Sequence, residues 1–183
     1  MADCAAASIT IGGIVTEAEF ITLCRLIAAE DLSVGEDGDP FSPADRTDGE
    51  PLRLFDHQAI GGHFESLEAW CFEHALPFSR WCAGYPGGWE AERVVFTGTG
   101  TIETYPATEK GDVIATRGTL DLHESISTLR AWFAAADFEI PPLAILADVA
   151  PPLTEITRAS AGREESGGGG SEHRSQLEKG AAQ

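Results

Sequence analysis

Apolar residues alternate with polar or small ones in several short runs, the pattern of strands with one buried face. The first run covers residues 8–15, in which Ile9 and Ile11 occupy alternate positions. Similar runs follow at 52–56, 78–82, 93–96, 101–105 and 113–116. Because short turns separate the last three runs, we expect them to form an antiparallel meander.

Three other segments repeat their apolar residues every three or four positions, which places those residues on one side of a helix. The first segment begins at Thr16, which forms a capping box with Glu19, and extends to about Asp31. The second ends before Pro77 and the third before Pro141. Together with the strand-like runs, these helices predict a single α+β domain, with a mostly antiparallel sheet and about three helices on one face.

The composition of the chain changes in two places. Residues 30–51 are rich in acids, glycine and proline, and we interpret them as a long acidic loop. After residue 153 the chain becomes rich in glycine, serine and glutamate, which predicts a disordered tail over 154–183. The folded domain is therefore expected to span 1–153.

The chain is strongly acidic. Its 183 residues include 30 acidic and 12 basic side chains, for a formal net charge of −18. Because 25 of the acids and 8 of the bases lie in residues 1–153, the predicted domain carries almost all of this charge. Such a surface repels nucleic acid and attracts basic proteins, although solubility alone is an alternative reason for the same charge. We therefore expect no direct binding to nucleic acid.

The sequence indicates a cytoplasmic protein. No apolar run approaches the ~20 residues of a membrane span, and the N-terminus lacks the basic and apolar regions of a secretion signal. The four cysteines are irregularly spaced, so we expect them to be reduced. They are Cys4, Cys24, Cys71 and Cys82.

Motifs for catalysis, metal binding and cofactor binding are missing from the sequence. It contains no nucleophile elbow, P-loop or dinucleotide-binding fingerprint. Cys71 and His74 form only one loose pair of metal-ligand types, whereas a zinc site uses two tight pairs. We therefore expect no metal, no cofactor and no catalytic residue of a known class.

One neighbourhood could nevertheless form a pocket of a small enzyme or ligand-binding domain. It comprises Arg53, Asp56, His57 and His63, around the start of the second predicted helix. Asp56 and His57 are a candidate acid–base pair. Adjacent residues of a strand point to opposite faces, so this pair requires a bulge or turn that reorients one of them.

Two groups of residues are candidates for binding a protein partner. Tyr85 and Trp89 flank a proline–glycine turn, and exposed aromatic residues are frequent anchors at interfaces. The alternative is that Trp81 and Trp89 only cover the sheet. The other group consists of the carboxylates of the long acidic loop: Glu36, Asp37, Asp39, Asp45 and Asp48.

Residues 60–81 combine a strand, Gly61-Gly62, a helix, Leu76-Pro77-Phe78 and Trp81, and Val94-Val95-Phe96 follows them. This run resembles small uncharacterised proteins of phages and plasmids of high-GC bacteria, over about residues 8–120. The resemblance implies a mobile-element setting and nothing about chemistry.

These observations lead to two hypotheses. The first is a non-enzymatic acidic protein that inhibits a nucleic-acid-binding host protein by occupying its basic groove. Its strategy would resemble that of anti-CRISPR and DNA-mimic proteins. The second is the small enzyme or ligand-binding domain described above.

Overall fold

A computed structural model describes residues 3–35 and 38–147, which belong to one compact unit, Met1–Val149. The predicted tail over 154–183, like Glu36 and Asp37, lies outside the described residues. The strands are β1 (Cys4–Ile11), β2 (Gly13–Thr16), β3 (Leu52–Ile60), β4 (Phe78–Cys82), β5 (Glu92–Phe96), β6 (Glu103–Pro106) and β7 (Leu143–Leu146). The helices are α1 (Glu17–Ala29), the 3-10 helix η1 (Pro43–Asp45), α2 (Glu65–Glu73), α3 (Arg117–Leu122) and α4 (Ile126–Ala136).

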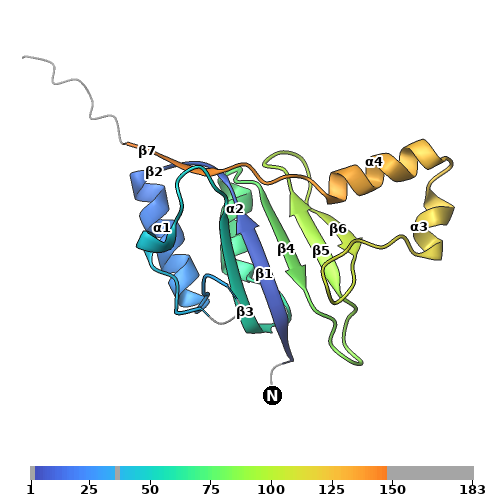
Figure 1. The fold of residues 1–183 in the computed structure, drawn as a ribbon, viewed down its shortest axis with the longest axis horizontal. Coiled ribbons are helices and arrows are strands. Elements are labelled where there is room, and N and C mark those ends of the chain that lie inside the picture. The colour runs from blue at the N-terminus through green and yellow to red at the C-terminus, as the bar shows by residue number, and fades with distance from the viewer. Residues whose placement is uncertain (1–2, 36–37, 148–183) are drawn as a thin grey trace, which may run out of the picture. The chain divides into compact units, whose positions relative to one another are not determined.

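Five strands form one sheet in the order β3-β1-β4-β5-β6, and each neighbouring pair is antiparallel (Figure 1). β2 and β7 form a separate parallel pair. The predicted α+β class with a mostly antiparallel sheet is therefore confirmed. Among the described residues, no helix is long and apolar enough to cross a membrane.

The main core lies between one face of the sheet and the helices α1 and α2. Residues of β1 and β4 that pair across the strands, such as Ile11 and Phe78, point to this face together. Leu23 of α1 and Leu67 of α2 are fully buried against it. Further buried members of the main core include Ile9, Ile27, Leu54, Cys71, Val94 and Phe96.

A smaller core lies on the opposite face, at the β5–β6 side of the sheet. Val95 and Tyr105 are buried there against Ala136, with Trp132 of α4 packed beside them. Val95 lies between Val94 and Phe96, which belong to the main core. The side chains of consecutive β5 residues therefore point to opposite faces of the sheet. The prediction that all helices lie on one face is therefore wrong for α4.

α1 begins as the sequence predicted. The Thr16 backbone N–H donates to Glu19 Oε2 at 2.7 Å, and the Glu19 N–H donates to Thr16 Oγ1 at 3.2 Å. These hydrogen bonds with the Thr16 backbone and side chain lower the pKa of Glu19. The predicted capping box is confirmed.

Two predicted elements differ in the structure. The run 8–15 is divided into β1 and β2 at Gly12, where the chain passes against the backbone of Pro141. The expected strand 113–116 is reduced to one bridge between Ala107 and Val113. The meander therefore ends at β6, and α3 begins four residues after that bridge.

Candidate functional site

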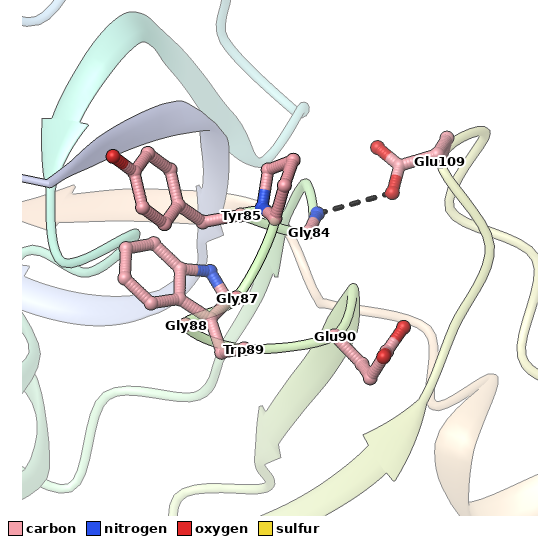
Figure 2. Close-up of a pocket in the computed structure, with 8 residues that line it drawn as sticks. Gly84, Tyr85, Gly87, Gly88, Trp89, Glu90 and Glu109 are labelled. Atoms are coloured by element: carbon pink, nitrogen blue, oxygen red, sulfur yellow. Dashed lines mark hydrogen bonds between the residues drawn. The ribbon is translucent and has the colours of Figure 1, made fainter.

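The loop between β4 and β5 contains a stacked pair of aromatic side chains. In this aromatic turn (residues 83–91), the rings of Tyr85 and Trp89 are stacked with their centroids 5.0 Å apart (Figure 2). The Tyr85 N–H donates to the Trp89 carbonyl at 2.8 Å, and Trp89 Nε1 donates to the Ala83 carbonyl at 3.1 Å. Pro86 followed by Gly87, with a φ of 81°, fits the central positions of a type II turn. The backbone thus holds both rings in place.

A hollow of about 300 Å³, the turn hollow, lies at this loop and is lined by Tyr85, Trp89, Glu90 and Glu109 together with turn glycines and Pro86. Glu109 comes from the turn after β6, and its Oε1 accepts a hydrogen bond from the Gly84 N–H at 3.1 Å (Figure 2). Among the described residues that line the hollow, two are carboxylates and none is basic.

The chemistry of the turn hollow favours a cation. The face of an aromatic ring carries partial negative charge, and an ammonium or guanidinium over it gains about 0.5–2 kcal/mol. Glu90 is exposed and adds a full negative charge. A third carboxylate, Asp3, hydrogen-bonds with Tyr85 and raises the pKa of its hydroxyl. A lysine or arginine side chain is therefore the matching ligand type.

Beneath the aromatic turn lies an ion-pair network that the sequence analysis missed. Arg80 is only 5% exposed, and its Nη1 donates to the Gly62 carbonyl at 2.7 Å. Its Nη2 donates to Glu92 Oε1 at 2.7 Å, and its Nε lies 2.9 Å from Glu68 Oε1 as an ion-pair contact without hydrogen-bond geometry. Burial acts to lower the pKa of Arg80, but the two glutamates outweigh it and the pKa is raised.

This network positions the aromatic turn. Arg80 joins β4 to α2, to β5 and to the turn at Gly62. A Cβ on Gly62 would lie 3.3 Å from Trp89 Nε1, so the Gly62 backbone is in close contact with the indole. Trp89 also packs against the main core. The indole is thus held from below while its hollow opens outward.

The long acidic loop is anchored to the body more firmly than its composition suggests. The Ser33 N–H donates to the Phe55 carbonyl at 3.0 Å, and the Phe41 N–H donates to the Leu32 carbonyl at 2.8 Å. The Phe41 side chain packs against the main core. The segment therefore follows the edge of the sheet beside β3.

The predicted loop carboxylates have different surroundings. Asp45 Oδ2 accepts from the Ser42 N–H at 2.8 Å and so caps η1, while Asp48 forms an ion pair with Arg46. Asp39 is exposed. None of these three lines the turn hollow among the described residues, so the structure does not bring Asp39, Asp45 or Asp48 into one site with the aromatic pair.

The proposed pocket around the histidines is only partly assembled. A register shift between β1 and β3 adds one residue to β3 after Asp56, and Asp56 and His57 line one hollow of about 380 Å³. The bulge that their cooperation requires is therefore present. Asp56 Oδ1 accepts from the Gln58 N–H at 2.8 Å, and the His57 ring stacks edge-on with Phe55.

Arg53 and His63 do not join that hollow as the sequence predicted. Asp56 lies three positions after Arg53 in β3, so strand alternation places the side chains of Arg53 and Asp56 on opposite faces of the sheet. Their partners in β1 are Thr10 for Arg53 and Ala7 for Asp56. Arg53 lines a different hollow. The His63 Nδ1 lies 3.0 Å from the Gly61 carbonyl, in the turn after β3.

The buried cysteines lack the properties of nucleophiles. Burial raises the pKa of Cys71 to about 12, and burial also raises the pKa of Cys82. A thiol with such a pKa is almost entirely protonated near neutral pH, and the thiolate is the reactive form. His74 stacks on Trp70 while Cys71 is buried in the main core, so these neighbours do not form a pair.

Comparisons with protein-family models, with curated proteins and with solved structures find no match to this chain.

Proposed function

We propose that the protein is a non-enzymatic acidic binding module that occupies the basic groove of a nucleic-acid-handling protein. The observation that carries this proposal is the turn hollow, which is lined by the stacked pair Tyr85–Trp89 and by Glu90 and Glu109. This arrangement receives a lysine or arginine side chain of the partner. Protein grooves that bind nucleic acid are lined with lysine and arginine side chains, so a partner of this kind offers many of them.

The charge of the chain supports the same kind of partner. A net charge of −18 steers basic surfaces toward the protein and speeds their encounter with it. Long-range electrostatic attraction alone gives little specificity, because it acts on any basic protein. The turn hollow adds a fixed contact of defined shape, with one aromatic pair and two carboxylates. Attraction and specificity thus have separate structural sources.

The biological setting that we propose is a mobile element of a high-GC bacterium. The resemblance of residues 60–81 and Val94-Val95-Phe96 to phage and plasmid proteins is its basis. In such a setting, an acidic protein that fills a basic groove inhibits the host protein in the manner of a DNA mimic.

Titration with N-acetyl-L-argininamide tests the turn hollow. The chain has four tryptophans, Trp70, Trp81, Trp89 and Trp132, whose indole N–H signals can be followed separately by NMR. We expect the Trp89 signal to shift most, because only this indole lines the turn hollow among the described residues. Glu90→Gln/Glu109→Gln removes two nearby charges and should weaken binding roughly fivefold to tenfold.

A matched double variant controls for net charge. Asp121→Asn/Glu124→Gln removes the same number of charges from exposed positions at α3 and just after it. This variant should bind the arginine derivative as the wild type does. Equal shifts of all four indoles, or equal affinity of the two double variants, would show that the turn hollow does not recognise the cation.

A further inference from the structure

The face of the sheet opposite α1 and α2 has a hollow of its own, whose lining differs from that of the turn hollow. This open-face hollow has a volume of about 430 Å³. Its floor consists of Thr10, Arg53, Ser79 and Arg93, from four neighbouring strands. Phe138, in the segment between α4 and β7, contributes to its wall.

The strand register determines the layout of the floor. Arg53 pairs with Thr10, and Thr10 pairs with Ser79, so the three side chains form one row across β3, β1 and β4. Paired residues have Cβ atoms ~5 Å apart, which gives ~10 Å between Arg53 and Ser79. Arg93 lies two positions along β5 from Val95, the partner of Ser79. Two hydroxyls thus lie between two guanidinium-bearing side chains.

The two arginines differ in their partners. Arg93 Nη1 donates to Asp137 Oδ1 at 3.1 Å, and its Nη2 donates to the Gly111 carbonyl at 2.6 Å. Arg53 is exposed, and its side chain makes no hydrogen bond or ion pair within the described parts of the chain. A guanidinium has five N–H donors, so Arg93 retains three and Arg53 all five for a ligand.

We propose that the open-face hollow binds a small organic oxyanion. A carboxylate or phosphate head group accepts hydrogen bonds from Arg53 and from the Thr10 and Ser79 hydroxyls, and the planar guanidinium matches either group. Phe138 provides an apolar wall for the rest of the ligand. Glu139 also lines the hollow and disfavours highly charged ligands such as triphosphates.

This site is independent of the proposed function. Thr10 lies near the end of β1 and Ser79 near the start of β4, whereas the aromatic turn follows the other end of β4. The two hollows share no residue among those described. One site can therefore fail its test while the other passes.

Benzoate, phenyl phosphate and neutral benzamide are suitable probes, each titrated into the full chain and followed by backbone-amide NMR. We expect benzoate or phenyl phosphate to shift the signals of Thr10, Arg53, Ser79 and Phe138 in a saturable way. The probe that binds more tightly identifies the head group. Benzamide has the same shape as benzoate without its charge and should bind at least tenfold more weakly.

Arg53→Gln should lower the affinity about tenfold, because it removes the charged donors and leaves an exposed side chain. Arg117→Gln, at an exposed position on α3, is the matched control and should leave the affinity unchanged. The proposal is overturned if neither anion shifts these signals, if benzamide binds as tightly as benzoate, or if Arg53→Gln binds like the wild type.

Discussion

Replacing Arg80 by alanine is expected to lower the free energy of unfolding by about 3–5 kcal/mol. The guanidinium compensates Glu68 and Glu92, whose side chains are only 15% and 35% exposed. Without it, both carboxylates face a poorly solvated space, and the Gly62 carbonyl loses its donor. Urea unfolding followed by tryptophan fluorescence and circular dichroism measures the loss.

Two further variants separate charge from volume in this experiment. Arg53→Ala removes an exposed arginine and should change the free energy of unfolding by no more than about 0.5 kcal/mol. Arg80→Met combined with Glu68→Gln and Glu92→Gln leaves no uncompensated charge and should recover most of the loss. A loss below about 1 kcal/mol in Arg80→Ala would contradict the role of the network.

Gly12→Ala is expected to destabilise the protein by about 3 kcal/mol or more. A Cβ at this position would lie 1.8 Å from the Pro141 carbonyl oxygen and 2.8 Å from Ile140 Cγ2. Both obstacles belong to the segment that leads into β7, so relief requires this backbone to move. The Gly12 N–H also donates to the Pro77 carbonyl at 3.0 Å, which holds the junction of β1 and β2 in place.

The same substitution at Gly118 is the matched control. There a Cβ would have its nearest neighbour, Thr116 Oγ1, at 3.7 Å, an ordinary contact distance. Gly118 lies in α3, where alanine is preferred to glycine by up to about 1 kcal/mol. Thermal and urea unfolding should therefore show a loss only for Gly12→Ala. Similar stability of the two variants would mean that the chain is not tightly packed at Gly12.

Local signals in the sequence predicted the fold well, and long-range contacts explain the differences. The capping box of Thr16 and Glu19 and the spacing of apolar residues after it are properties of one helix, and α1 forms where they predict it. The position of α4 depends instead on which face of β5 is left uncovered. Val95 shows this: it is one of three successive buried residues, so its sequence pattern does not distinguish the two faces.

The candidate site was predictable only in part. Tyr85 and Trp89 stand out in the sequence as aromatics that flank a turn, but Glu109 is 25 residues away from Gly84, its backbone partner. The pairing of β5 with β6 brings it to the turn hollow, together with the hydrogen bond from Trp81 Nε1 to the Thr108 carbonyl. The sequence also contained a signal for Arg80, which was missed. Arg80 alternates in β4 with Phe78 and Cys82, which are buried, and therefore points to the same face as they do. A charged residue in that position predicts buried partners.

The proposal that this protein fills a basic groove is tested by capture of partners from a bacterial lysate. The immobilised wild type should retain a nucleic-acid-binding protein at low salt and release it at high salt or when duplex DNA is added. Glu90→Gln/Glu109→Gln should retain about tenfold less, whereas Asp121→Asn/Glu124→Gln should retain as much as the wild type. An empty capture, a partner that duplex DNA does not displace, or equal retention by the two double variants would contradict the proposed function.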